Sequence, residues 1–140
     1  MNFVRIGGHI TNPLPVLAHL QTDGSFWVKQ KKGRCAAWLE KANQSATLKQ
    51  KWDLNVANST QSEWMSIEHG ILFALENNEE CMAIENDNLG VVSALIGCRW
   101  LSNEWEKYCF QRIHKLAKQS VWTGIRWIPR ELNKADQILR

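Results

Sequence analysis

The spacing of hydrophobic residues changes along the chain, and each spacing predicts a different kind of element. Short apolar runs bounded by turn-forming residues are typical of β-strands. Apolar residues that recur every three or four positions are typical of one face of an amphipathic helix. We therefore expect strands at residues 16–22, 34–39, 48–56, 81–85 and 121–128, and helices at residues 60–76, 89–96, 103–116 and 133–139. Gly24 permits a turn or bulge, after which residues 25–30 are a candidate continuation of the first strand.

Several residues mark the expected ends of these elements. Asn58-Ser59-Thr60 predicts the start of the first helix, Thr60 and Glu63 have capping-box spacing, and Asn77-Asn78 predicts the end of this helix. Ser102 or Asn103 is expected to cap the third helix. The sequence Lys31-Lys32-Gly33 predicts a hairpin turn between the first two strands. The apolar stripe of the third helix is formed by Trp105, Tyr108, Cys109, Ile113 and Leu116.

The order of these elements predicts an α/β fold. Three meandering strands followed by alternating helices and strands imply a mixed five-stranded sheet with helices on both faces. Residues 1–15 contain Gly7-Gly8 and Pro13-Leu14-Pro15, so we expect them to form an extended lead-in. Residues 16–140 are expected to form one domain.

Composition limits the class of protein. The chain has 140 residues, of which 44% are hydrophobic and 22% charged, as in ordinary globular domains. No apolar run approaches the roughly 18–20 residues that span a bilayer, and residues 1–16 lack a signal-peptide pattern, so we expect a cytoplasmic protein without membrane contact. The four cysteines show no CxxC spacing, which favours free thiols over a zinc site.

The net charge is only +3, but its distribution is uneven. Residues 29–51 contain seven basic side chains and only one acid, whereas residues 52–98 contain eight acids and no Lys or Arg. Residues 99–140 are basic again, with nine basic residues and four acids. A basic rim around an acidic pocket suits a polyanion whose phosphate meets bound metal, although any single lysine can simply be a solvated surface residue.

Four acidic residues stand at the ends of four expected elements. If they gather in one pocket, their carboxylates repel each other strongly unless divalent cations neutralise them. Oxygen ligands suit Mg²⁺, which in turn suits phosphate chemistry. The four candidate metal ligands are Asp23, Glu63, Asp87 and Asp136.

Each of these acids also has a simpler explanation. Asp23 before Gly24 is compatible with a turn, and Glu63 with a helix cap. Asp87 is compatible with capping the following helix, and Asp136 with the favourable dipole of a helix start. Their occurrence in one order on the expected elements favours a shared metal site.

The four motifs together resemble those of the type 1 ribonuclease H family, in its short form without a basic insertion. The resemblance covers about residues 16–140, and each motif alone is weakly specific. The matching segments are Thr22-Asp23-Gly24-Ser25, the helix start around Glu63-Trp64, the strand end Ile84-Glu85-Asn86-Asp87-Asn88, and Asn133-Lys134-Ala135-Asp136.

This resemblance implies a three-layer ribonuclease H-like fold and hydrolysis of the RNA strand of RNA/DNA hybrids. The expected products carry 5′-phosphate and 3′-hydroxyl ends. The family uses two Mg²⁺ ions roughly 4 Å apart, and Mn²⁺ can substitute. By analogy, Asp23 would bridge both ions, Glu63 and Asp87 would hold the ion on the leaving-group side, and Asp136 would hold the ion that activates water.

The resemblance also implies contacts to the substrate, and we expect a monomer whose partner is an RNA/DNA hybrid. Recognition of 2′-hydroxyls across the minor groove would give little sequence preference. The candidate contacts are Gly24, Ser25, Asn88, Arg130 and Asn133, and Trp27 and Trp38 are candidates for sugar stacking.

Two departures from the family pattern leave alternatives open. The loop Pro129-Arg130-Glu131-Leu132 has no histidine, and His9, His19, His69 and His114 lie elsewhere in the sequence. Arg130 or Glu131 is a candidate substitute. There is also no room for a basic insertion between Gly97 and Val121. Another nuclease of the same fold that acts on DNA, or a nucleic-acid-binding module with a vestigial site, therefore remains an alternative.

Overall fold

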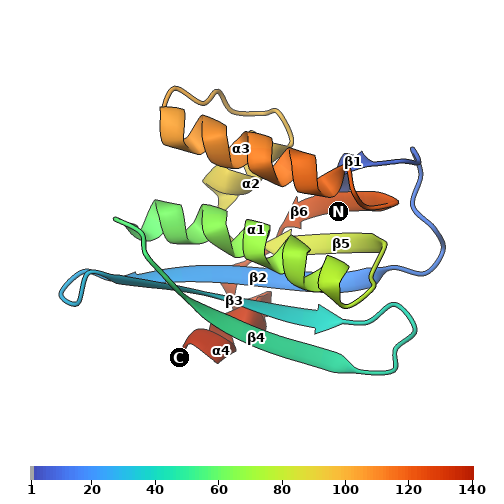
Figure 1. Ribbon diagram of the computed structural model, residues 1–140, viewed down its shortest axis with the longest axis horizontal. Helices are drawn as coiled ribbons and strands as arrows, with labels where there is room; N and C mark the ends of the chain where they lie inside the picture. Colours follow the sequence, from blue (N-terminus) through green and yellow to red (C-terminus); the bar gives the residue numbers. More distant parts are fainter. Residues whose placement is uncertain (1) are drawn as a thin grey trace.

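A six-stranded mixed sheet forms the centre of the molecule (Figure 1), which we describe from a computed structural model for residues 2–140. The strand order is β1-β6-β5-β2-β3-β4. The strands are β1 (Val4–Gly8), β2 (Ala18–Trp27), β3 (Lys32–Glu40), β4 (Thr47–Leu54), β5 (Cys81–Asn86) and β6 (Trp122–Trp127). The helices are α1 (Ser59–Glu76), α2 (Leu89–Leu95), α3 (Glu104–Ala117) and α4 (Ala135–Leu139), with a 3₁₀ turn at Arg130–Leu132.

The central strands of the sheet are parallel. β5 pairs in parallel with both β2 and β6, whereas β1, β3 and β4 add antiparallel strands at the two sides. Thr22 of β2 lies in register with Asn86 of β5. The residues that follow them, Asp23 and Asp87, therefore lie side by side, at the level where β5 ends.

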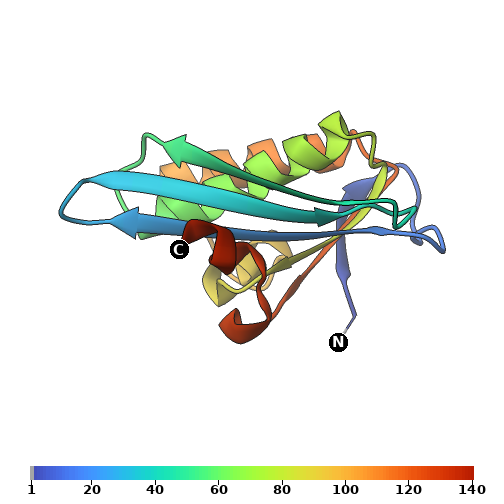
Figure 2. The same cartoon turned by 90° about the horizontal axis from the view of Figure 1, so that it is seen from below.

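Helices cover both faces of the sheet, as expected. α1 and α3 lie side by side on one face, and the short α4 packs on the opposite face against β2, β3 and β4 (Figures 1 and 2). The predicted apolar face of α1 is buried, because Trp64, Ile67 and Ile71 are fully inaccessible. On the other face, Ala36 of β3 packs against Ala135 and Leu139 of α4.

The sheet has one strand more than the sequence predicted. Val4–Gly8, placed by the sequence in an extended lead-in, forms β1 and pairs antiparallel with β6, while Met1 lies outside the described residues. The burial of Ile6 in the main core accounts for this pairing. Gly7 and Gly8 allow it sterically, since a Cβ on Gly8 would lie 2.4 Å from the carbonyl oxygen of Val121.

The hairpin turn between β2 and β3 lies earlier than predicted. It comprises residues 28–31 and is closed by a hydrogen bond from Lys31 N to Val28 O at 3.3 Å, with Lys31 at a φ of 50°. Gly33, which suggested the turn, is a strand residue. A Cβ there would meet Val56 Cγ2 at 2.4 Å and Ser62 Oγ at 2.7 Å, so glycine serves close packing beneath α1.

Two details of the helices also differ from the sequence prediction. Asn58 caps α1 by accepting a hydrogen bond from Gln61 N at 2.9 Å, so Thr60 and Glu63 do not form the capping box. Tyr108 is 55% exposed and does not belong to the buried stripe of α3, which is formed by Cys109, Ile113 and Ala117. Asn103 caps α3, as one of the two predicted alternatives.

Among the described residues, no helix has both the length and the hydropathy that a bilayer-spanning segment needs. The four cysteines are free thiols, of which Cys98 is exposed and the other three are buried.

Candidate metal-binding site

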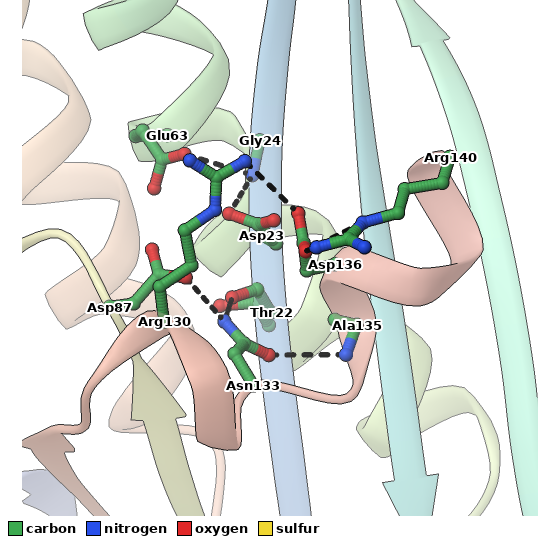
Figure 3. A network of polar contacts seen from close by, with 10 residues as sticks. All are labelled: Thr22, Asp23, Gly24, Glu63, Asp87, Arg130, Asn133, Ala135, Asp136 and Arg140. Carbon is green, nitrogen blue, oxygen red and sulfur yellow. Dashed lines mark hydrogen bonds and ion pairs between the residues drawn. The ribbon is translucent and has the colours of Figure 1, made fainter.

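Three of the four predicted acids meet at the edge of the sheet. Asp23, Glu63 and Asp87 each present a carboxylate oxygen, and these oxygens all lie within 4.8 Å of one another. We call these three residues the carboxylate cluster. They come from the middle of β2, the first turns of α1 and the residue after β5, so three separate segments build the site (Figure 3).

Gly24 fixes the approach of β2 to α1. Its backbone N–H is shared between Asp23 Oδ1 at 3.0 Å and Glu63 Oε1 at 3.1 Å. A Cβ at this position would lie 2.4 Å from Ser62 O, so a larger residue would push the helix away. The predicted motif residue Gly24 therefore holds two carboxylates in place.

Glu63 is directed into the cluster because Asn58, and not Glu63, completes the helix cap. Its side chain is 8% exposed. Oxygen Oε1 accepts from Gly24, whereas Oε2 is buried and has no hydrogen-bond partner. A buried carboxylate oxygen without a donor is costly unless a cation satisfies it.

Asp87 is held by residues beneath and beside it. Asn133 Nδ2 donates to Asp87 Oδ2 at 3.3 Å, and Trp127 Nε1 donates to the Asp87 carbonyl at 3.0 Å. The fully buried Asn86 donates to Thr22 O at 3.0 Å and accepts from Asn88 N at 2.8 Å. These contacts fix the direction in which the chain leaves β5.

Asp136 lies next to Asp23 but outside the three-residue carboxylate cluster (Figure 3). Its oxygen Oδ2 accepts from Arg140 Nε at 3.0 Å and from Arg140 Nη2 at 2.6 Å. Its other oxygen lies 3.5 Å from Arg130 Nη2. Two arginines therefore compensate the charge of Asp136.

The cluster carboxyls are hard to ionise together. Burial, and then the charge of Asp87, raise the pKa of Asp23 to about 7. Burial, and then the charges of Asp23 and Asp87, raise the pKa of Glu63 to about 9. Burial also raises the pKa of Asp87.

Asp136 has the opposite shift. Burial alone would raise its pKa, but the hydrogen bonds and charge of Arg140, together with the charge of Arg130, outweigh burial and lower it. The site therefore consists of a buried, mutually repelling group next to one ionised carboxylate that is already paired.

This donor set fits a hard divalent cation. All candidate ligands are carboxylate oxygens, which Mg²⁺ and Mn²⁺ prefer to softer donors. The unpartnered Glu63 Oε2 supplies an acceptor directed into the cluster, and cation charge would favour the ionised carboxylates that burial, and then nearby negative charge, disfavour. A possible metal-binding cluster is thus present.

The candidate substrate residues occupy different positions. Gly24 and Ser25 border the cluster on β2, and Asn88 Oδ1 caps α2 by accepting from Val91 N at 3.0 Å. The guanidinium of Arg130 is exposed and extends across the cluster towards Asp136 (Figure 3).

Asn133, expected as a substrate contact, is only 3% exposed. Its amide donates to Thr22 O at 2.9 Å and to Asp87, and accepts from Ala135 N at 3.1 Å. This arrangement gives it a positioning role beneath the cluster, because both ends of the amide are already used within the protein.

Sequence reasoning missed two residues that organise the site. Arg140 stands four residues after Asp136, and this helical spacing was the available signal for their ion pair. Asn86 was visible only as part of the strand-end motif. Asn86 is completely buried and its side chain donates to Thr22 Oγ1, so it links β5 to β2.

The fold is shared with solved ribonuclease H structures. The N-terminal RNase H domain of a Mycobacterium tuberculosis protein, solved as a fusion with maltose binding protein, is 21% identical and has a TM-score of 0.79, with 87% of this chain and 89% of that chain covered. RNase H1 from the halophilic archaeon Halobacterium salinarum is 15% identical with a TM-score of 0.78, over 84% and 89%. LC11-RNase H1, solved in complex with an RNA/DNA hybrid, is 14% identical with a TM-score of 0.73, over 88% and 99%.

The architecture and the acidic cluster thus define an α/β protein of the ribonuclease H fold, which confirms the resemblance seen in the sequence. Residues 21–139 match the family described as reverse transcriptase-like, and the chain belongs to this family. A comparison with curated proteins gave no match.

Proposed function

We propose that this protein is a divalent-metal-dependent endoribonuclease that hydrolyses the RNA strand of RNA/DNA hybrids and leaves 5′-phosphate and 3′-hydroxyl ends. The observation that carries the proposal is the gathering of Asp23, Glu63 and Asp87 within 4.8 Å at the sheet edge of a ribonuclease H fold. The hybrid bound to LC11-RNase H1, which has the same fold, supports the choice of substrate.

Two Mg²⁺ ions, or Mn²⁺ in their place, are the proposed cofactors. Asp23, Glu63 and Asp87 would hold one ion, and Asp136 together with Asp23 would hold the second. When bound, these ions would lower the pKa of a water molecule and stabilise negative charge on the phosphate and the leaving oxygen. For Asp136 to bind metal, its carboxylate would have to give up part of its pairing with Arg140.

The residues around the ligands keep them in position. Gly24 N–H fixes one oxygen of Glu63, and Asn133 fixes Asp87, so both carboxylates are oriented before metal arrives. Such prior orientation reduces the rearrangement needed at the reacting phosphate.

Arg130 is the proposed phosphate contact on the loop that lacks a histidine. Its side chain is 74% exposed, and its ion pair with Asp136 is long, at 3.5 Å. The guanidinium is therefore free to donate bidentate hydrogen bonds to a phosphate entering the site. Gly24, Ser25 and Asn88 border the same edge and are proposed to lie along the RNA strand, where 2′-hydroxyls distinguish it from DNA.

A panel of four matched substrates tests this function. Purified protein in Mg²⁺ should cleave the RNA strand of the hybrid and leave duplex DNA, duplex RNA and single strands largely intact. The product ends can be read by 5′-phosphate-dependent exonuclease digestion and by primer extension from the 3′-hydroxyl. Cleavage of duplex DNA without cleavage of the hybrid would replace this proposal with a DNA nuclease.

A further inference from the structure

A cluster of basic and aromatic side chains lies at the end of the β2–β3 hairpin, outside the carboxylate cluster. We call residues 27–34 the hairpin tip. It has four basic side chains, and no acidic residue occurs between Gly24 and Leu39. Val28, the first residue of the turn, is 77% exposed. The basic side chains are Lys29, Lys31, Lys32 and Arg34.

Trp27 and Arg34 form an ordered platform within the hairpin tip. The guanidinium carbon of Arg34 lies 5.2 Å from the Trp27 ring centroid, and Asp53 of β4 holds Arg34 Nε at 2.9 Å. A shallow hollow of about 290 Å³ is lined by Trp27, Gln30, Lys32 and Arg34. Because Arg34 contacts both Trp27 and Asp53, the hollow is lined by ordered side chains.

The platform shares a sheet face with the carboxylate cluster. Asp23, Ser25 and Trp27 alternate along β2 and therefore point to the same side, which is also the side of Arg34, the cross-strand partner of Ser25. Four strand residues from Asp23 to Trp27 span about 13 Å at roughly 3.3 Å per residue. This distance matches the rise of about four base pairs of a B-form duplex, at roughly 3.4 Å per pair.

The connection between α2 and α3 offers little basic surface for a duplex. The segment between α2 and α3, residues 96–103, contains Arg99 as its single basic residue, and Arg99 Nη2 is paired with Glu106 Oε2 at 3.0 Å. Lys29 and Lys31, in contrast, are exposed at the turn. The hairpin is also the part of the molecule that extends furthest beyond the start of α1 (Figure 1).

We propose that the hairpin tip is a second binding site for the nucleic-acid duplex, about four base pairs from the bond that is cleaved. Lys29 and Lys31 contact backbone phosphates, and the Trp27–Arg34 platform stacks on a sugar or an unpaired base. This inference rests on the proposed function in taking the polyanion to be the cleaved hybrid.

Equilibrium binding to an RNA/DNA hybrid in Ca²⁺, across a series of salt concentrations, tests the phosphate contacts. The double variant Lys29→Gln/Lys31→Gln should bind more weakly at low salt, and its slope of log K against log salt should be shallower by about 1.8, or about 0.9 per lost phosphate contact. Lys115→Gln/Lys118→Gln removes two charges that are also exposed, at the far end of α3, and should leave the slope unchanged. Equal slopes for the two double variants would overturn the proposal.

Trp27→Leu tests the platform separately. It should weaken binding about fivefold or more without changing the salt slope, because stacking carries no charge. Hybrids lengthened one base pair at a time from the cleaved bond should show an affinity step near four base pairs for the unaltered protein, and the hairpin variants should lose it. Absence of that step in the unaltered protein would contradict the placement.

The outcomes for the hairpin and for the proposed function are separable. Cleavage of saturating hybrid in Mg²⁺ reports on the proposed function alone. Suppose that the unaltered protein cleaves the hybrid and that Lys29→Gln/Lys31→Gln has the same salt slope as the unaltered protein. This result would reject the hairpin site only. A shallower slope without hybrid cleavage by the unaltered protein would support the hairpin as a duplex-binding site and reject the nuclease proposal.

Discussion

The backbone N–H of Gly24, in the middle of β2, donates to Glu63 Oε1 near the start of α1 at 3.1 Å. The strand and helix are in contact at this point, since the place of a Cβ on residue 24 lies only 2.4 Å from Ser62 O. One glycine therefore sets both the spacing of the two elements and the position of a candidate metal ligand.

Replacing this glycine should damage activity more than stability. Gly24→Ala should reduce hybrid cleavage by about a hundredfold, because displacement of α1 by about 1 Å misplaces Glu63. Gly90→Ala is the matched control, since a Cβ there meets only side-chain atoms at ordinary distances, with Asn88 Oδ1 the nearest at 3.4 Å and Arg99 Nε next at 3.9 Å. Cleavage rates and thermal unfolding should be measured for both variants. Normal cleavage by Gly24→Ala would show that this contact does not position the site.

Two glutamates of α1 should respond differently to the same substitution. Glu63→Gln should abolish cleavage, whereas Glu68→Gln should keep most of it. Glu68 lies on another face of the helix and forms an ion pair with Arg112 Nη2 at 2.5 Å. Loss of that pair should lower the free energy of unfolding by about 1–2 kcal/mol. The reverse order of activities would show that Glu63 is not the ligand.

Stability without metal should fall as pH rises. The folded-state pKa values of Asp23 and Glu63 are about 7 and about 9, above their ordinary values of 3.8 and 4.5. The folded state therefore holds protons that the unfolded chain releases, and this contribution to stability is lost as pH rises through the folded-state values. In a chelator, the melting temperature should decrease between about pH 5 and about pH 9.

Glu63→Gln serves as the control for this pH dependence, because it removes the cluster carboxyl whose pKa is raised to about 9 and should flatten the decrease. Added Mg²⁺ should oppose the decrease, since metal favours the ionised carboxylates. A melting temperature that rises steadily with pH in the chelator would contradict the burial and repulsion seen at the cluster.

Arg130 should affect catalysis with little effect on folding. Arg130→Ala should lower cleavage of hybrid about tenfold or more, through loss of a phosphate contact, while the free energy of unfolding changes by less than about 0.5 kcal/mol. Arg130→Lys should restore part of the rate, because lysine keeps the charge without the bidentate geometry. Glu131→Gln, on the same exposed turn, removes the other candidate substitute for the histidine and should keep the rate. Unchanged rates in Arg130→Ala would exclude the contact.

Most of the elements could be predicted from periodicity. The buried face of α1 is visible in the sequence as an apolar stripe, and the burial of β5 is visible as an apolar run. β1 could not, since Val4–Gly8 is short and rich in glycine, and its strand conformation depends on pairing with β6 at the other end of the chain. The Lys31-Lys32-Gly33 turn was misplaced because a glycine that serves close packing looks the same in sequence as one that serves a turn.

The candidate site was partly predictable for a similar reason. Local motifs placed acids at the ends of elements, and parallel pairing of β2 with β5 brings Asp23 and Asp87 together. The pairing of Asp136 with Arg140 and Arg130, and the burial of Asn133, depend on how α4 packs under β2 and β3. Such tertiary contacts have no fixed spacing in the sequence.

The most direct test compares the unaltered protein with Asp87→Asn in cleavage of an RNA/DNA hybrid labelled on the RNA strand. The unaltered protein should cleave in Mg²⁺ or Mn²⁺ and stop in a chelator, and Asp87→Asn should lose at least about a hundredfold in rate, since a neutral amide holds the cation poorly. Asp23→Asn should behave in the same way, and neither variant should unfold at a lower temperature without metal, because each removes a repelling charge. Full cleavage by purified Asp87→Asn, or cleavage that persists in a chelator, would contradict the assignment of the carboxylate cluster as the metal-dependent active site.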